Sequence, residues 1–349
     1  TWRVSTMTEQ RPIQPTPVGA FRFNTDSAKL EYFNGDEYVN ITTDSPEANT
    51  GGTRGLWAGR NSPHTDAIDF VNIDTTGNAS DFGNLVANTG IACAMSSRVR
   101  GVIAGGTSPN DSGNSDKMDF VTIASTGNAS DFGNLVTARH GCMANSNSTR
   151  GLIIGGRTPS RLNSIEYITI AATGNAVDFG DASDTVQFSS ATNNQTRGLF
   201  AMGNTNPAYV NSIEFVTMST LGNSSDFGDL TTIRAVSSAF GNAVRGVFSR
   251  GELYPGENET NVMDFVTFST LGNAQDFGDS VSSVKNGMDG GCSSPTRGCS
   301  GGGSVPGNTQ SNNIDYVQIM TTGNAVDFGD LNQGGQYPSA FSNGHGGLG

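Results

Sequence analysis

The sequence has few basic residues, few histidines and no long apolar stretch. Lysine and arginine together number 19 against 32 acidic residues, and the formal net charge is -13. Because phosphate neutralisation needs clustered lysine and arginine, this balance argues against nucleic-acid binding. No apolar run approaches the length of a membrane span, and the opening residues TWRVSTMTEQ lack the apolar core of a signal peptide. We therefore expect no membrane insertion.

Residues typical of metal sites and catalytic centres are also scarce. The four cysteines contain no CxxC pair, so we expect neither a disulfide framework nor a zinc site, and Cys299 stands where the other repeats have a buried Leu or Val. The three histidines occupy unrelated places, and there is no GxSxG sequence and no D-x-D-x-D-G calcium loop. The sequence predicts no catalytic residue, no metal and no cofactor.

Three short patterns each recur six times along the chain, at a period of roughly 47 to 51 residues. The first, GN-x-x-DFG, begins at Gly77, Gly127, Gly174, Gly222, Gly272 and Gly323. The second, Arg-Gly plus an apolar residue, begins at Arg54, Arg100, Arg150, Arg197, Arg245 and Arg297. The third is an apolar segment of the type IDFVNI, whose second residue is acidic. Such fixed-period repetition indicates a solenoid, a propeller or an array.

One repeat, from Leu135 to Ala182, shows the strand pattern of the unit. Short β-branched or aromatic segments at Gly141–Asn147, Arg150–Ile154, Ile165–Ile170 and Ala176–Phe179 are bounded by Gly, Asn or Ser. The third segment is apolar on both faces, which suits a sheet packed between two others. Four short antiparallel strands in about fifty residues are typical of a propeller blade.

The two ends of the repeat region complement each other. The first Arg-Gly has no clear strand before it, whereas the last repeat continues into an extra first strand at Gln336–Ser342. We predict that this segment pairs with Arg54–Gly59 and closes a ring. The predicted fold class is all-β: a six-bladed β-propeller of four-stranded antiparallel blades over residues 51–349, closed by a C-terminal strand.

The double glycines Gly105–Gly106 and Gly155–Gly156, which follow the second strand, resemble those of Kelch-like β-propellers. The other repeats read AGR, MGN, SRG and GGG there, and the Kelch Tyr and Trp landmarks are absent. The TRG-x-x-x-GG and GNAxDFGDL units more closely resemble repeats in virion proteins of tailed bacteriophages, including marine cyanophages. That resemblance covers most of the chain and implies a virion structural protein.

Ahead of the repeats, residues 1–17 contain several prolines and are predicted to form an extended arm. Residues 18–50 are predicted to be a small β-meander with strands at Ala20–Asn24, Lys29–Phe33 and Glu37–Ile41. The pattern G-x-x-RFNT followed by E-x-F-x-G-x-x-Y resembles a hairpin module of phage tail fibres. That resemblance implies attachment to the particle, and the candidate attachment residues are Arg22, Phe23, Tyr32 and Tyr38.

Each repeat carries one arginine at the start of its second strand and one acid in its third strand. We predict a structural ion pair within each unit or a bridge to neighbouring backbone. The predicted pairs are Arg54 with Asp69, Arg100 with Asp119, Arg150 with Glu166, Arg197 with Glu214, Arg245 with Asp264, and Arg297 with Asp315.

The segments between the second and third strands differ in length and content, whereas the turns between the third and fourth strands barely change. All six variable segments leave one face of a propeller, and binding residues concentrate on such loops. Neutral drift of exposed loops is the alternative explanation. If the face binds a ligand, aromatic residues and arginines are expected to dominate; the candidates are His64, Arg157, Arg161, Tyr209 and Tyr254.

Three functions fit these expectations. The first is a non-enzymatic, homo-oligomeric tail fibre or adhesin in the virion, assembled in the host cytoplasm. It would attach to other virion proteins through its N-terminal region and present the variable loops to a glycan or protein of the host surface. The second is a capsid or tail decoration protein with no host recognition. The third is a glycan-cleaving propeller enzyme.

Overall fold

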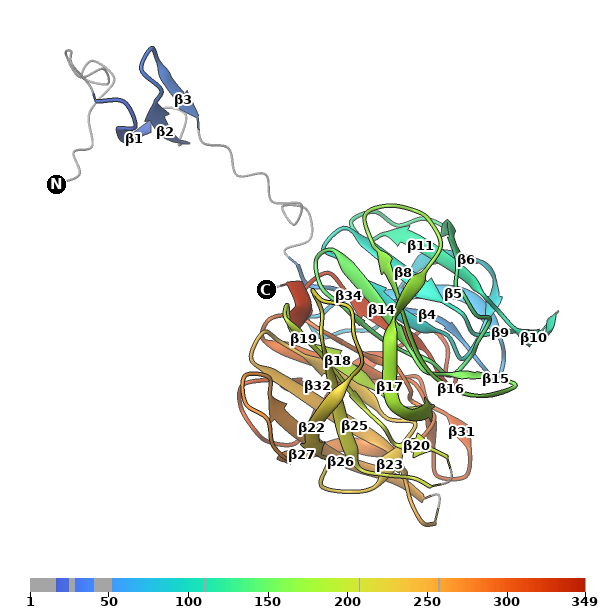
Figure 1. The fold of residues 1–349 in the computed structure, drawn as a ribbon. Helices are drawn as coiled ribbons and strands as arrows, with labels where there is room; N and C mark the ends of the chain where they lie inside the picture. The colour runs from blue at the N-terminus through green and yellow to red at the C-terminus, as the bar shows by residue number, and fades with distance from the viewer. Residues whose placement is uncertain are drawn as a thin grey trace. The chain divides into compact units, whose positions relative to one another are not determined.

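The computed structural model describes residues 17–24, 29–40, 52–109, 111–206, 208–256 and 258–348 (Figure 1). The chain forms two compact units, Thr1–Ala48 and Asn49–Gly349. The predicted arm, residues 1–17, lies outside the described residues except for Pro17. The described residues contain no α-helix, so the all-β prediction is confirmed.

The smaller unit contains a three-stranded antiparallel sheet of β1 (Phe21–Asn24), β2 (Lys29–Phe33) and β3 (Tyr38–Asn40), close to the predicted strands. On one face, Arg22 bonds the buried Glu31 at 2.6 Å, and its guanidinium lies 3.8 Å from the centre of the Tyr38 ring. On the other face, Phe21 and Phe23 are more than half exposed and lie opposite Tyr32 and Leu30 in the register. Of the predicted attachment residues, Arg22 and Tyr38 therefore pack within the module, while Phe23 and Tyr32 belong to its exposed apolar face.

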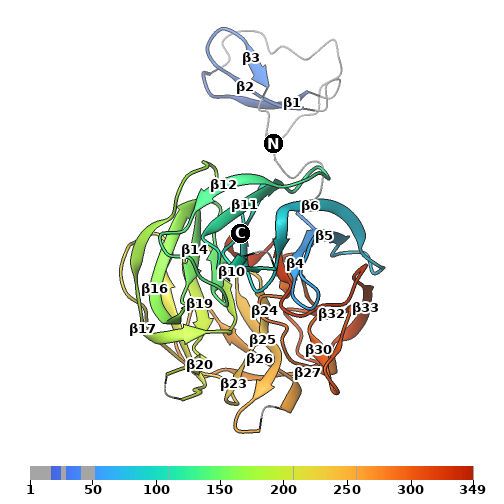
Figure 2. The same cartoon turned by 90° about the vertical axis from the view of Figure 1, so that its right-hand side faces the viewer.

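The larger unit is built from antiparallel sheets that share one pattern of four strands (Figure 2). Sheet 1 contains β34 (Ser339–Ser342), β4 (Arg54–Arg60), β5 (Thr65–Asn72) and β6 (Ser80–Thr89); sheet 2 contains β7 (Cys93–Ser96), β8 (Arg100–Ala104), β11 (Lys117–Thr122) and β12 (Ser130–Asn134); sheet 3 contains β13 (Met143–Ser146), β14 (Arg150–Ile154), β16 (Ser160–Thr169) and β17 (Val177–Gln187); sheet 4 contains β18 (Ala191–Asn193), β19 (Arg197–Ala201), β21 (Ser212–Thr217) and β22 (Ser225–Asp229); sheet 5 contains β24 (Ser238–Gly241), β25 (Arg245–Leu253), β26 (Asn258–Thr267) and β27 (Gln275–Val284); sheet 6 contains β28 (Gly291–Ser293), β29 (Arg297–Gly301), β32 (Asn313–Gln318) and β33 (Val326–Asp330). Short additional strands extend some of these sheets or form separate hairpins: β9 (Thr107–Ser108), β10 (Asp111–Asn114), β15 (Arg157–Thr158), β20 (Asn204–Thr205), β23 (Arg234–Ala235), β30 (Ser304–Val305) and β31 (Thr309–Gln310).

The first strand of sheet 1 comes from the far end of the chain, as predicted. Ser339 pairs with Ala58 and Ser342 with Gly55, so β34 runs antiparallel to β4, and Gln336 adds a bridge to Asn61. After β34 the chain ends in a 3₁₀ turn, η2 (Gly346–Leu348). No described strand of the larger unit precedes β4 in the sequence, so one edge of β4 would be unpaired without β34. The pairing with β34 gives this edge a hydrogen-bonded neighbour.

The apolar core lies between adjacent sheets. In one cluster, Met95 and Val102 of sheet 2 pack with Ile153 and Ile168 of sheet 3. In another, Trp57 of sheet 1 packs with Cys299 of sheet 6. Cys299 is fully buried, as expected for a small apolar residue, and all four cysteines are free thiols. Each sheet packs against a neighbouring sheet on both faces, which explains why the third strands are apolar on both faces.

Adjacent sheets are joined at their outer strands by the GN-x-x-DFG motif. The backbone N–H of Gly127 donates to the carbonyl oxygen of Phe82 in the preceding sheet at 2.8 Å, and the Asn128 side chain accepts from the Asn84 N–H at 3.1 Å. The same pair of bonds occurs at every junction, including the junction of sheet 6 with sheet 1 through Gly77. Gly83 has φ +146°, and a Cβ atom there would collide with the Gly127 carbonyl. The repeated decapeptide is thus an intersheet clamp that requires glycine at its point of closest approach.

The predicted ion pairs within each repeat are wrong. Arg150 stands opposite Thr169 in the register, whereas Glu166 stands opposite Ile153, which places them about three residues, or roughly 10 Å, apart along the strands. Arg150 instead covers the Tyr167 ring, 4.7 Å from its centre, and donates to the Met218 carbonyl of the next sheet at 2.8 Å. The other five second-strand arginines make the same ring contact and the same kind of bridge to backbone, which was the predicted alternative. Where the acids have arginine partners, these are different ones: Arg60, Arg139, Arg234 and Arg250.

Candidate binding site on the loop face

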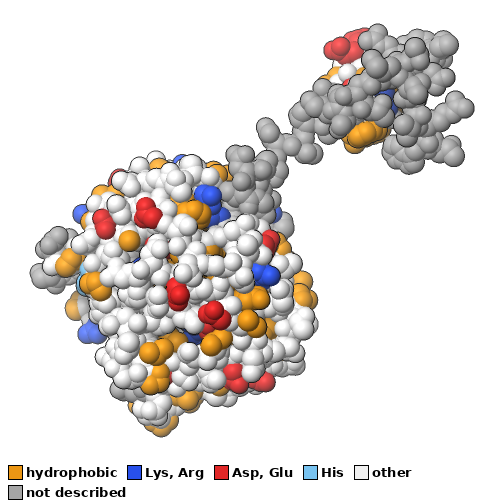
Figure 3. Space-filling view, turned by 180° about the vertical axis from the view of Figure 1, so that it is seen from behind, with side chains coloured by type: hydrophobic (Ala, Val, Ile, Leu, Met, Phe, Trp, Pro, Cys, Tyr) orange, Lys and Arg blue, Asp and Glu red, His pale blue; other side chains and the backbone are white. Residues whose placement is uncertain are grey.

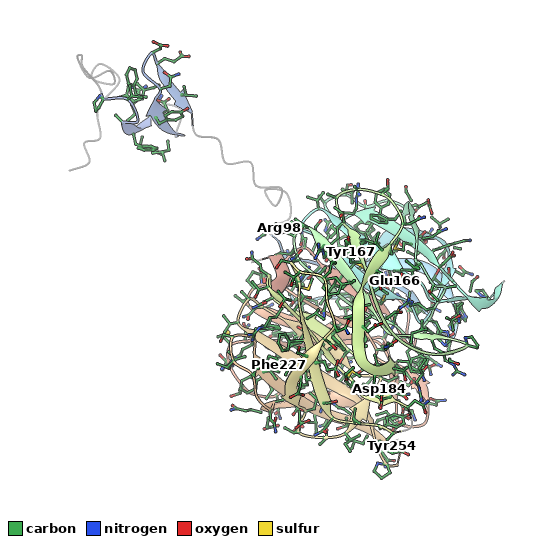
Figure 4. The ribbon with its side chains drawn as sticks, viewed as in Figure 1. Arg98, Glu166, Tyr167, Asp184, Phe227 and Tyr254 are labelled. Carbon is green, nitrogen blue, oxygen red and sulfur yellow. The ribbon has the colours of Figure 1, made fainter. Side chains whose placement is uncertain are left out.

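The variable segments between second and third strands share one end of the larger unit, which we call the loop face. They comprise residues 60–67, 107–117, 157–164, 204–212, 252–262 and 304–313. Much of this sequence forms short hairpins, such as β15 with β16 and β30 with β31, and β25 continues with β26 as one long hairpin. In Figure 4, Tyr254 projects from this end, whereas Arg98 lies at the opposite end beside η2. Of the five candidates, Arg157 lies on β15 and Arg161 on β16, whereas His64, Tyr209 and Tyr254 lie outside the strands.

The strand register places several polar side chains in one row across the loop face. Arg157 pairs with Arg161, and Gln187 pairs with Asn204. Leu162 pairs with Val186, so Arg161 and Gln187 face each other at the next position. Directly opposed residues on neighbouring strands present their side chains on the same side of a sheet. The row therefore joins Arg157, Arg161, Gln187 and Asn204 across sheet 3 and its extension, and we call it the polar row.

The polar row ends at a pair of stacked tyrosines. Asn204 forms a bridge with Tyr209, and its Nδ2 donates to the Tyr209 hydroxyl at 3.3 Å. The Tyr209 and Tyr254 rings are parallel within 10°, with centroids 4.2 Å apart. Tyr254 remains 43% exposed and so offers an aromatic surface to solvent. Because Tyr209 and Tyr254 come from different sheets, their stacking joins the variable segments of sheets 4 and 5.

Two further aromatic residues lie close to this site at the start of first strands. The Phe188 ring is 5.8 Å from Tyr337 and 5.7 Å from the His140 ring. The Tyr337 hydroxyl donates to Asn286 Oδ1 at 2.7 Å, and burial, with lesser effects of Glu252 and Tyr209, raises its pKa to about 12. Tyr337 therefore stays neutral at physiological pH and acts as a hydrogen-bonding aromatic group.

Three buried polar atoms of the polar row have no hydrogen-bond partner within the described part of the chain. They are Arg161 Nε, Gln187 Oε1 and Asn204 Oδ1. Gln187 and Asn204 are only 5% and 7% exposed, so leaving their carbonyl oxygens unpaired costs free energy. A guanidinium donates hydrogen bonds and amide oxygens accept them, and a hydroxyl-rich ligand can use both kinds of group. This combination with an exposed ring suits a polar ligand that has an apolar face.

The structure brings together four of the five candidates on the loop face: Arg157, Arg161, Tyr209 and Tyr254. His64 is also on this face but apart from these four, at the junction of sheets 1 and 2; its Nε2 lies 3.0 Å from Thr107 Oγ1, and burial lowers its pKa. Sequence reasoning missed Gln187 and Asn204, because neither lies in an aromatic or charged pattern. Only the strand register, which the sequence does not state, shows that they stand beside the arginines.

At the centre of the larger unit, a cavity of about 50 Å³ lies among the first strands. Its lining includes Asp289. Asp289 lies in the segment from Asn286, which has a left-handed backbone, to Ser293. This segment is two residues longer than the corresponding segment of sheet 2, from Ile91 to Ser96. The Asp289 carboxylate accepts the Ala94 N–H at 2.8 Å, and its backbone carbonyl accepts the Ala340 N–H. Burial raises the pKa of Asp289 to about 8. The insertion thus places a protonated acid inside the cavity at neutral pH.

We expect Asp289→Asn to change how stability varies with pH. Below about pH 4 the carboxyl is protonated whether the chain is folded or unfolded; between pH 4 and 8 only the folded state keeps the proton. Asp289 therefore makes the wild type lose stability as pH rises through this range, by at most about 1.4 kcal/mol per pH unit. Asparagine keeps an acceptor for Ala94 and removes this dependence. Urea unfolding should show that the free energy of unfolding of the variant, relative to that of the wild type, is higher at pH 8 than at pH 5. An equal difference between the two proteins at both pH values would contradict the raised pKa of Asp289.

No protein-family model matches the chain, and no curated protein matches it significantly. Within the described residues no helix is long and apolar enough to cross a membrane, and no three His, Cys, Asp or Glu side chains are grouped to hold a metal ion. On the face in Figure 3, lysine and arginine side chains form separate spots among mainly uncharged groups.

Proposed function

We propose that the chain is a non-enzymatic structural protein of a bacteriophage virion, a tail fibre or adhesin whose loop face binds a glycan of the host surface. The observation that carries the binding function is the polar row, with its unpaired buried atoms, ending at the stacked pair Tyr209 and Tyr254. Sugars present hydroxyls that both donate and accept hydrogen bonds and C–H faces that pack on aromatic rings. The polar row and Tyr254 complement these two features.

In this proposal the six sheets are the blades of a closed, Kelch-like β-propeller. The first strands contact one another in the cyclic order β34, β7, β13, β18, β24, β28 and back to β34. The arginine bridges follow the same order, and the bridge from Arg297 to the Ile73 carbonyl links sheet 6 to sheet 1 at 3.2 Å. The clamp of Gly77 on the Phe328 carbonyl links the same two sheets at the outer strands. These bonds support a ring without an open edge, which holds the loop face rigid.

The smaller unit serves as the attachment module, as its resemblance to tail-fibre hairpins suggests. Its exposed apolar face, formed by Phe21, Phe23, Leu30 and Tyr32, seats on another virion protein or on a second copy of this chain. Many copies on one particle raise the overall affinity of individually weak glycan contacts. The partners are thus other virion proteins, further copies and the host surface, with no nucleic acid or cofactor involved.

Binding of the purified protein to an array of bacterial surface glycans tests the proposal. We expect saturable binding to at least one glycan class and a tenfold or greater loss in Tyr254→Ala, equivalent to about 1.4 kcal/mol. Leu271→Ala is the matched control, because Leu271 is 58% exposed but lies in the turn at the opposite end of β26. Equal loss in both variants, or no binding by the wild type, argues against glycan recognition. Glycan cleavage during the assay would favour an enzyme.

The position of each end in an intact particle distinguishes an adhesin from a decoration protein. With a label inserted in segment 252–262 and another at the N-terminus, an adhesin exposes the first label and buries the second. If the loop face is covered by other subunits while the N-terminus faces solvent, the decoration function is the better explanation.

A further inference from the structure

The third-strand acids of the six sheets occupy equivalent places, and four of them hold a guanidinium. The ion pairs are Arg60 with Asp69, Arg139 with Glu166, Arg234 with Asp264, and Arg250 with Asp315. Both partners are almost completely buried in each case. A buried carboxylate without such compensation is costly, which explains why these arginines are present.

The four guanidiniums reach this place from different parts of the chain. Arg139 and Arg234 precede the first strands of their own sheets, Arg60 ends β4 of the same sheet, and Arg250 extends from the preceding sheet. Arg139 Nη1 donates to the Gly155 carbonyl at 2.8 Å, and Arg250 donates to the equivalent Gly302 carbonyl at 3.5 Å. The four arginines come from different positions in the chain, but their guanidiniums bind at the same place in the sheet. The third-strand acid and the neighbouring backbone carbonyls therefore form a site that favours a guanidinium.

The acid of sheet 4 is compensated by other groups. Glu214 accepts hydrogen bonds from the hydroxyls of Ser183 and Ser224 and from the Ser183 backbone N–H. It is only 5% exposed and makes no ion pair with any described residue. Glu214 therefore needs no guanidinium.

Asp119 of sheet 2 has neither kind of partner. Its carboxylate accepts one backbone N–H, from Val86 at 3.0 Å, and no salt bridge to it is found in the described residues. The other five acids are at most 5% exposed, but Asp119 is only partly buried. Desolvation is the main cause that raises its pKa, and Lys117 and the Val86 N–H lower it only in part. The Asp119 carboxylate is thus close enough to Lys117 to be affected by its charge but forms no salt bridge within the described residues.

A cavity of about 40 Å³ lies beside Asp119 and is lined by Thr89, Gly105, Thr107 and Lys117. Thr89 occupies the repeat position that Arg139 has in the next repeat. The segment from Gly83 to Ile91 has the same length as the segment from Gly133 to Gly141, and Thr89 and Arg139 stand at the same place within them. The space that an arginine fills in sheets 3 and 5 is therefore empty of side chain in sheet 2. Its volume exceeds the roughly 10–15 Å³ that one water requires.

We propose that this cavity binds a guanidinium group supplied from outside the described chain, a site distinct from the polar row. The acceptors are the Asp119 carboxylate and the backbone carbonyls of Gly105 and Lys117. In sheet 3 the equivalent carbonyls, of Gly155 and Ser164, both accept from Arg139. Gly105 N–H donates to the Lys117 carbonyl just as Gly155 N–H donates to that of Ser164, so the backbone frame of the site is the same. The source is either an arginine side chain of a partner protein or a small free guanidinium compound.

Titration with methylguanidinium chloride, followed by calorimetry and thermal unfolding at constant ionic strength, tests this site. We expect saturable stabilisation of the wild type at millimolar concentrations and none in Asp119→Asn. In Thr89→Arg the cavity is filled from within, so the variant should melt at a higher temperature and no longer bind the probe. Glu214→Gln is the matched control and should bind like the wild type. Tetramethylammonium, which cannot donate hydrogen bonds, should have no effect on any of them.

Stabilisation that is equal in the wild type and Asp119→Asn, or absent from the wild type, would overturn the proposal. A blocked arginine amide separates the two sources. Tighter binding of the amide than of methylguanidinium indicates an arginine of a partner protein, and the reverse order indicates a small free ligand. A failure of glycan binding by Tyr254→Ala has no bearing on these results, because the two sites share no residue.

Discussion

Truncation after Gln336 should abolish the cooperative unfolding transition of the larger unit and make the protein aggregate. The truncation removes β34, whose Phe341 and Ala340 are buried and whose backbone pairs with β4 from Gly55 to Ala58. Loss of a buried phenylalanine side chain alone costs about 3–5 kcal/mol, and whole domains are stable by only about 5–15 kcal/mol. The deletion also exposes the edge of β4, an open template for pairing with another chain.

The tight fit of Phe341 makes the effect specific to this strand. A Cβ atom on Gly101 would collide with the Phe341 ring, so the ring lies directly on the backbone of sheet 2. β34 also contacts β28 of sheet 6, and its loss would separate three sheets at once.

Truncation after Asn343 provides the matched control, since it removes η2 but keeps β34 and the 2.9 Å bond from the Arg54 N–H to Asn343 Oδ1. Circular dichroism during heating and size-exclusion chromatography compare the three proteins. We expect the control to retain a single transition and the shorter protein to lose it. If both truncated proteins melt at the temperature of the wild type, β34 does not hold the sheets together.

Features that depend on the strand pattern could be predicted from sequence. Each repeat has β-branched and aromatic segments at a fixed spacing, so β14 was located to the residue and the pairing of β34 with β4 followed from the incomplete ends. The third strand was predicted too short, because β16 begins at Ser160 within a segment that varies between repeats. Local apolar patterns define strands well, but they do not show where a hairpin extends beyond the core.

The partners of buried charges could not be predicted in this way. The position of Arg139 carries an arginine again only at Arg234, and that of Arg250 in no other repeat, so neither belongs to a sixfold pattern, whereas the periodic Arg150 does not pair with the acid. Which side chain reaches Glu166 depends on the register and on the packing between sheets. The polar row was missed for the same reason, since Gln187 and Asn204 become neighbours only through pairing of β17 with β20.

The second large effect is expected from Arg139→Met, which should lower the free energy of unfolding at pH 8 by about 3–5 kcal/mol. The Arg139 side chain is fully buried, pairs with Glu166 and bonds the carbonyls of Gly155 and Ser164. Methionine fills much of the volume but supplies no charge and no donor. Glu166, which is 2% exposed, is then left as a buried carboxylate whose remaining support is backbone N–H groups, chiefly that of Val136 at 2.8 Å.

The pH dependence of this loss identifies its cause. Desolvation already raises the pKa of Glu166, and the guanidinium of Arg139 is the largest influence that lowers it. Without Arg139 the folded-state pKa rises further above that of the unfolded chain, so the variant loses stability as pH increases and is closest to the wild type near pH 4–5. Thr89→Met is the matched control at the equivalent position of sheet 2, where no guanidinium is lost, and it should change stability by less than about 1 kcal/mol. Urea unfolding at pH 5 and pH 8 distinguishes the cases: a loss in Arg139→Met that is the same at both values would mean that packing, not the uncompensated charge of Glu166, accounts for the effect.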